Sequence, residues 1–148
     1  MAEFLLDTDT ASRLLLADRK TVTAMRRSGA EAIGISTVTK SELLYGARLR
    51  SNKPAFMAAV RAFLARVTVH PWDEDAAEQH ALIRAAAKAK GRSAAAFDLM
   101  IAAHARALGA TLATSDAAIG KLGVDELKVV DWRGRWALWY QPGRVLTD

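Results

Sequence analysis

Short apolar segments alternate with longer helical segments along this chain, and this alternation limits the possible folds more than any other feature. The first of them, Phe4 to Leu6, is uniformly apolar, which is typical of a strand covered on both sides. Strands that alternate with helices predict a mostly parallel sheet between two layers of helices. The sequence therefore predicts a three-layer α/β fold, with strands at 4–6, 32–36, 68–69, 111–114 and 128–130.

Capping residues and helical spacing predict where the helices begin and end. After a turn at Thr8 and Asp9, we expect Thr10 or Ser12 to cap the first helix. The other helices are expected at 21–27, from Ser36 or Thr37 to about Arg50, from Pro54 to about 67, from Asp73 or Glu74 to Gly91, and at 97–108 before Gly109. There is no internal repeat or linker, so the chain is predicted to be one domain.

Composition limits the kind of metal site that the chain could build. It has 148 residues and no cysteine, which excludes disulfides, thiolate catalysis and cysteine-ligated zinc. The three histidines, His70, His80 and His104, are not at ligand-like spacing. Any metal site would therefore be built mainly from oxygen ligands.

The charge balance favours a polyanionic partner. Twenty-one Lys and Arg against sixteen Asp and Glu give a formal net charge of +5, which attracts nucleic acid whatever its sequence. No apolar run approaches the ~20 residues of a membrane span, and the start of the chain lacks the basic region of a signal peptide. We therefore expect a cytoplasmic protein with no membrane contact.

Four acidic residues stand where a parallel sheet could bring them to one edge. Asp7 and Asp116 follow predicted strands, Asp98 lies at the start of a helix, and Glu42 is in the second turn of another. Ligands bind at the carboxyl ends of the strands in such sheets. Taken singly, each residue also suits an ordinary turn, cap or solvated helix face. Together they predict a site for a hard divalent cation, which prefers oxygen ligands.

The same segments resemble the PIN-domain ribonucleases, and most closely the VapC toxins of bacterial toxin–antitoxin pairs. The resemblance runs from Phe4 to Trp132 and is carried by LLDT (5–8), ISTVTKSELLYG (35–46), FDLMIAAHA (97–105) and ATSD (113–116). It implies a PIN-like nuclease domain over residues 1–132. It also implies a VapB-like antitoxin that inserts a segment into the cleft, and a homodimer or a toxin–antitoxin hetero-oligomer.

The resemblance assigns the catalytic acids as Asp7, Glu42, Asp98 and Asp116 and implies a metal-dependent ribonuclease. Our hypothesis is that Asp7, Asp98 and Asp116 hold Mg²⁺ or Mn²⁺, while Glu42 orients water or a second ion. One ion or two are both compatible with the sequence. Packed carboxylates repel one another, so without metal at least one should have a raised pKa. The hydroxyls of Thr8, Thr114 and Ser115 are expected to position water or a carboxylate.

Some positions depart from the family pattern or add to it. Asp9 stands where Asn is common and places a fifth carboxylate beside Asp7. Among the basic residues, Arg48, Arg92 and Lys121 lie nearest the acidic segments in sequence and are the candidates for RNA binding. Residues 133–148, with Trp136, Trp139 and Tyr140, lie outside the resemblance, and we interpret them as an extension packed on the same domain or used for interaction.

Three other functions are compatible with parts of the sequence. Asp7-Thr8-Asp9 resembles the start of haloacid-dehalogenase-type phosphatases, but Ala11 replaces the usual Thr or Val and the later Lys with paired aspartates is missing. A non-catalytic binding module could keep the acidic cleft as an interaction surface, although all four acids are present. A PIN nuclease that processes RNA outside a toxin pair is the third alternative.

Overall fold

A five-stranded parallel sheet forms the centre of the protein. The computed structural model describes residues 3–29, 32–50 and 53–133. The strands are β1 (Glu3–Leu6), β2 (Ala32–Ser36), β3 (Thr68–His70), β4 (Thr111–Ala113) and β5 (Val129–Val130), and they lie in the order β3-β2-β1-β4-β5. Every neighbouring pair is parallel. The predicted α/β class with a parallel sheet is confirmed.

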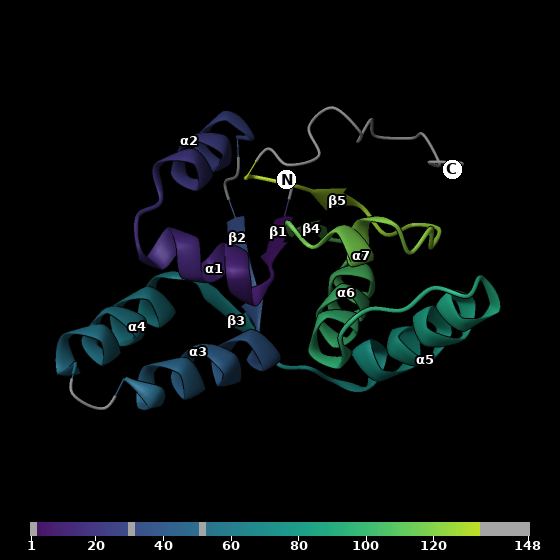
Figure 1. Cartoon of the computed structure of the whole chain (residues 1–148), viewed down its shortest axis with the longest axis horizontal. Helices are drawn as coiled ribbons and strands as arrows, with labels where there is room; N and C mark the ends of the chain where they lie inside the picture. Colours follow the sequence, from purple (N-terminus) through teal and green to yellow (C-terminus); the bar gives the residue numbers. More distant parts are fainter. Residues whose placement is uncertain (1–2, 30–31, 51–52, 134–148) are drawn as a thin grey trace.

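Helices cover both faces of this sheet. They are α1 (Thr8–Leu15), α2 (Arg19–Arg27), α3 (Thr37–Leu49), α4 (Pro54–Arg66), α5 (Glu74–Ala89), α6 (Ala96–Leu108) and the short α7 (Ala117–Gly120). Figure 1 shows α1 to α4 on one side of the strands and α5 to α7 on the other. The molecule therefore has the three layers that the sequence predicts.

Two hydrophobic cores, one on each face, explain why β1 is apolar from Phe4 to Leu6. Phe4 and Leu6 pack with Ile35 and the α1–α4 layer, whereas Leu5 packs with Ile83 and the α5–α7 layer. Successive side chains of a strand point to opposite faces, so a strand buried on both sides cannot alternate with polar residues. β1 is consequently fixed by both layers, and the residue that follows it is held at a defined place.

Several predicted boundaries differ from the observed ones, and the first helix is the instructive case. α1 begins at Thr8 and is capped by Asp7, whose Oδ1 accepts a hydrogen bond from the Thr10 backbone N–H at 2.8 Å. The predicted caps, Thr10 and Ser12, were wrong because a residue assigned to the site also caps the helix. α6 likewise begins at Ala96, which puts Asp98 inside its first turn.

The chain order produces a switch point beside β1. From β1 the chain adds β2 and β3 on one side and later β4 and β5 on the other. In such sheets the carboxyl ends of the strands that flank the switch leave room for a ligand. No helix among the described residues is long and apolar enough to cross a membrane. Apart from Arg133, the predicted extension at residues 133–148 lies outside the described residues.

The α5–α7 core gives a test of the fold. Ile83 of α5 is completely buried, while its neighbour Leu82 is 55% exposed. We expect Ile83→Ala to lower the free energy of unfolding by about 2–5 kcal/mol, because apolar burial is removed and a cavity is left behind. Leu82→Ala is the matched control and should change it by less than about 0.5 kcal/mol. Urea denaturation measures both; equal effects would contradict the described packing of α5.

Candidate functional site

Asp7 lies at the carboxyl end of β1 and is only 5% exposed. Its Oδ2 accepts a hydrogen bond from the Thr114 hydroxyl at 2.5 Å, and its Oδ1 accepts one from the Thr10 backbone N–H. Burial raises the pKa of Asp7 above its usual value, while these hydrogen bonds work in the opposite direction. The carboxylate is therefore held in one orientation by β4 on one side and by α1 on the other.

Glu42 reaches the same region from α3. The helix starts at the carboxyl end of β2, where Ser36 caps it, and in its second turn Glu42 is half-buried. Its Oε1 accepts a hydrogen bond from the Thr8 hydroxyl at 2.5 Å, and Thr8 lies 3.5 Å from the buried Thr39 hydroxyl. Thr8 thus links the first turn of α1 to α3.

Asp98 is the residue whose pKa the other acids raise. It is half-buried in the first turn of α6, and its pKa is raised to about 7. Burial is the largest cause, followed by a shared hydrogen bond with Asp116 and by repulsion from Asp116, Asp7 and Glu42. All four predicted acids are consequently close enough to influence one carboxyl group, although they come from four separate segments.

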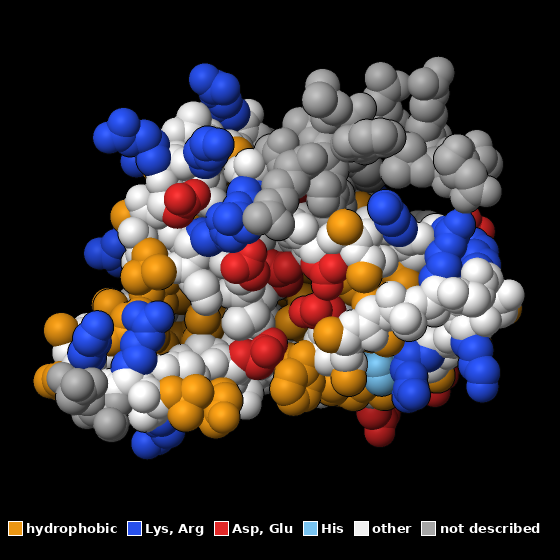
Figure 2. All heavy atoms as spheres, viewed as in Figure 1, with side chains coloured by type: hydrophobic (Ala, Val, Ile, Leu, Met, Phe, Trp, Pro, Cys, Tyr) orange, Lys and Arg blue, Asp and Glu red, His pale blue; other side chains and the backbone are white. Residues whose placement is uncertain are grey.

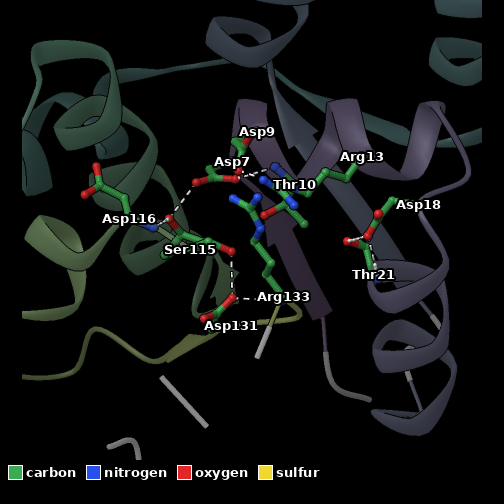
Figure 3. A network of polar contacts seen from close by, with 11 residues as sticks. Asp7, Asp9, Thr10, Arg13, Asp18, Thr21, Ser115, Asp116, Asp131 and Arg133 are labelled. Atoms are coloured by element: carbon green, nitrogen blue, oxygen red, sulfur yellow. Dashed lines mark hydrogen bonds and ion pairs between the residues drawn. The ribbon is translucent and has the colours of Figure 1, made fainter. Parts of the chain in front are cut away.

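Asp116 lies in the loop after β4, and a set of side-chain hydrogen bonds fixes this loop. The Thr114 hydroxyl accepts from the Asp116 backbone N–H at 3.1 Å, and Asp116 Oδ1 caps α7 through the Ala118 N–H at 2.9 Å. The Ser115 hydroxyl donates to Asp131 Oδ1 at 2.6 Å (Figure 3). Thr114 therefore serves the site directly, whereas Ser115 ties the loop to the end of β5.

Asp131 and Asp9 show where the inferences from sequence were incomplete. Asp131 follows β5 just as Asp7 follows β1, so its position after a predicted strand is the sequence signal that points to it. Its Oδ1 also accepts from the Arg133 backbone N–H at 2.8 Å.

The side chain of Asp9 is 57% exposed and pairs with Arg13 at 3.0 Å on the surface of α1 (Figure 3). Asp9 adds to the repulsion on Asp7 but is turned toward solvent.

Two of the three basic candidates lie together, and the third lies apart from them. Arg92 Nη1 donates to the Lys121 carbonyl oxygen at 2.8 Å, so these two residues meet between the end of α5 and the end of α7. Arg48 is exposed in the last turn of α3, at the opposite end of that helix from the sheet edge. In Figure 2, acidic side chains gather at the centre of the face, and Lys and Arg side chains lie on both sides.

The donor set suits a divalent cation, although its oxygens have protein partners in this arrangement. Within the described ranges, no three acidic or histidine side chains are already gathered in the geometry of a metal site. However, Asp116, Asp7 and Glu42 are close enough to Asp98 for their charges, together with burial, to raise its pKa to about 7. A hard cation would relieve this repulsion, since Mg²⁺ and Mn²⁺ favour carboxylate oxygens. The chemistry of the residues therefore fits the predicted metal.

The raised pKa of Asp98 generates a titration experiment. We expect its side-chain carboxyl to titrate near pH 7, as measured by carbon NMR, and Asp116→Asn to lower this pKa because one negative charge is removed. Asn caps a helix about as well as Asp, so α7 should be retained. Asp125→Asn, at an exposed loop position, is the charge-matched control. An ordinary pKa for Asp98 in the unaltered protein would contradict the described cluster.

The same shift sets the sign of a stability change with pH. The unfolded chain releases the Asp98 proton near the usual value of 3.8, whereas the folded protein holds it to about pH 7. The folded state therefore binds more protons across this window, and this group makes the free energy of unfolding fall as pH rises through it. Urea denaturation at several pH values should show a smaller fall in Asp98→Asn.

Comparison with known proteins agrees with this geometry. The family model for the PIN domain matches residues 4–124. A tRNA(fMet)-specific endonuclease VapC of Shigella flexneri is 32% identical over 116 residues, which cover 78% of this chain and 88% of the relative. The VapC endonuclease of Salmonella typhimurium, also named as specific for tRNA(fMet), is 30% identical over the same shares.

Solved structures show the same fold. The DNA-bound VapBC complex of Salmonella typhimurium contains a chain that is 28% identical, with a TM-score of 0.78 over 89% of this chain and 99% of that one. VapBC-1 of nontypeable Haemophilus influenzae gives 27% identity and a TM-score of 0.75, over 88% and 98%. Family and fold coincide, which confirms the resemblance found in the sequence. The chain belongs to the PIN-domain family, as a member of the VapC type.

Proposed function

We propose that this VapC-type protein is a metal-dependent endoribonuclease and the toxin of a toxin–antitoxin pair. The observation that carries the proposal is the convergence of Asp7, Glu42 and Asp116 on the half-buried Asp98. A surface that only needed solubility would not pack acidic groups so closely that one of them keeps its proton. The VapC relatives of Shigella and Salmonella are named endonucleases specific for tRNA(fMet), which supports RNA as the substrate class.

We assign the binding of Mg²⁺ or Mn²⁺ to Asp7, Asp98 and Asp116, with Glu42 orienting water or a second ion. A divalent cation there would supply positive charge to a phosphoryl oxygen and favour ionised water as the nucleophile. The chain's own contribution is to hold the carboxylates against their mutual repulsion. Thr114 fixes Asp7, and Thr8 fixes Glu42, each through a hydrogen bond of 2.5 Å. The proton on Asp98 would leave as a cation binds.

The partner follows from the structural neighbours. The neighbours of Salmonella typhimurium and Haemophilus influenzae are VapBC structures, and another neighbour is described as a member of the VapBC family of toxin–antitoxin systems. We therefore propose a VapB-like antitoxin for this chain and a homodimeric or hetero-oligomeric assembly. A cytoplasmic location, where both RNA and an antitoxin would be available, completes the proposal. A PIN nuclease that processes RNA without an antitoxin is the second candidate, because the acidic site would serve it equally well.

Cleavage of RNA tests the assignment of the acids. Purified protein, freed of any antitoxin, should cut total cellular RNA at discrete positions with Mg²⁺ or Mn²⁺ and lose this activity in EDTA. We expect Asp7→Asn and Asp98→Asn to lower the rate at least about a hundredfold, because several kcal/mol of charge stabilisation would be removed. Asp125→Asn, with the same charge change at an exposed position, should remain active.

The pattern of results separates the interpretations. Cutting that persists in EDTA or in both acid variants would mean a contaminant or a different site. Metal-dependent cutting that disappears in both variants but not in Asp125→Asn would support the assignment. The sequences at the fragment ends would then name the RNA and distinguish a tRNA substrate from ribosomal or messenger RNA.

Co-expression separates the toxin from the processing nuclease. For a toxin, the product of a small reading frame next to the gene should co-purify with this protein and suppress cleavage at equimolar amounts. Its removal should restore cutting, and expression of this chain alone should arrest growth unless Asp7 is replaced by Asn. A chain that cuts RNA but neither arrests growth nor binds such a product would instead be an RNA-processing enzyme.

A further inference from the structure

A pocket of about 500 Å³ lies between the end of α5 and the start of α6, and its charged lining is entirely cationic. Arg84 and Lys88 stand one turn apart on α5, and Arg92 follows in the turn after the helix. We call this the basic pocket. Like charges four residues apart weaken a helix slightly, so helix stability does not explain the arrangement. The right-hand side of Figure 2 shows Lys and Arg side chains over this end of α5.

The turn that carries Arg92 is rigidly attached to the segment after the site. Gly91 has a φ of +65°, and the Arg92 backbone N–H donates to the Ala87 carbonyl at 2.8 Å. The Arg92 guanidinium bonds to the Lys121 carbonyl and lies where a side chain at Gly123 would collide with it. A cation held in this way gives up little conformational freedom when it binds a phosphate.

An exposed aromatic ring lies next to Asp98 in the sequence and two residues before a residue that lines the pocket. Phe97 is 56% exposed, although it is in the first turn of α6. The next residue is the acid Asp98, and Leu99 after it lines the basic pocket. Aromatic rings beside cationic grooves are the usual means of binding single-stranded nucleic acid, because bases stack on the ring while the phosphates meet the cations.

We propose that the basic pocket binds a backbone phosphate of single-stranded RNA next to the cleaved bond, and that Phe97 stacks on a neighbouring base. The inference rests on the proposed ribonuclease function and adds a binding site to it. Arg84 and Lys88 supply most of the charge, Arg92 adds a cation already held in place by the Lys121 carbonyl, and Phe97 holds the strand between the pocket and Asp98. The site would recognise single-stranded RNA whatever its base sequence, since every base has a face that can stack on the ring.

Binding of a fluorescein-labelled single-stranded RNA ten-mer, followed by anisotropy in EDTA, tests the pocket without cleavage. Arg84→Ala/Lys88→Ala should weaken binding and reduce the slope of log affinity against log salt by about 0.7 for each phosphate that the pair no longer neutralises. Arg61→Ala/Arg66→Ala removes two exposed charges from α4 and is the matched control. We expect the control to leave the slope unchanged.

Variants at Phe97 test the stacking. Phe97→Leu keeps an apolar residue but removes the ring and should weaken binding about tenfold, whereas Phe97→Trp should restore it. In cleavage with metal, both Phe97→Leu and Arg84→Ala/Lys88→Ala should raise KM and leave kcat within about twofold, since these groups bind the substrate and the transition state equally.

The outcomes distinguish this inference from the proposed function. An unaltered protein that cuts RNA, together with pocket variants that bind and cut as it does, would overturn the inference alone. An unaltered protein that binds the ten-mer through the pocket but cuts no RNA would overturn the ribonuclease and retain the binding site. If the Arg84/Lys88 and Arg61/Arg66 pairs weakened RNA binding equally, general electrostatic attraction would explain the binding and the inference would be overturned. If the pocket variant changed the sedimentation coefficient but not the RNA affinity, the pocket would be a protein contact, which would also overturn the inference.

Discussion

The burial of β1 on both faces is the constraint on which the site depends. Phe4 and Leu6 are fixed by one helical layer and Leu5 by the other, so the carboxyl end of the strand cannot move relative to either. Asp7 begins where this burial ends, and Thr114 at the end of β4 holds its carboxylate. The strand pair that carries the core therefore also carries the first two parts of the site.

The fold holds acidic side chains close together at this edge of the sheet, although they repel one another. Asp98 has a pKa of about 7 because burial and three other carboxylates oppose its ionisation. Side-chain hydrogen bonds from threonines hold Asp7 and Glu42 in place despite this cost. A cation that bound there would relieve this repulsion. The repulsion therefore lowers the stability of the folded protein at the place where a cation would be favoured, as is common for functional sites.

Much of the site could be predicted from sequence, for a physical reason. Residues that follow strands in a parallel sheet must emerge at one edge, so the positions of Asp7 and Asp116 followed from the apolar runs before them. The same rule places Asp131 after β5, but only the structure shows that the Ser115 hydroxyl donates a hydrogen bond to it. Asp9 was grouped with Asp7 because the two are close in sequence. A helix rotates neighbouring residues by about 100°, however, and Asp9 is turned toward solvent.

The sequence by itself determined the class of fold, the succession of its elements and the oxygen-rich character of the site, because these depend on local patterns and on which residue types are present. Only the tertiary structure decided which groups meet. The contacts between Thr8 and Glu42, between Thr114 and Asp7, and between Arg92 and Lys121 join segments 29 to 107 residues apart. Periodicity carries no information about contacts between segments so far apart in the sequence. The packing of two helical layers on one sheet fixes these contacts.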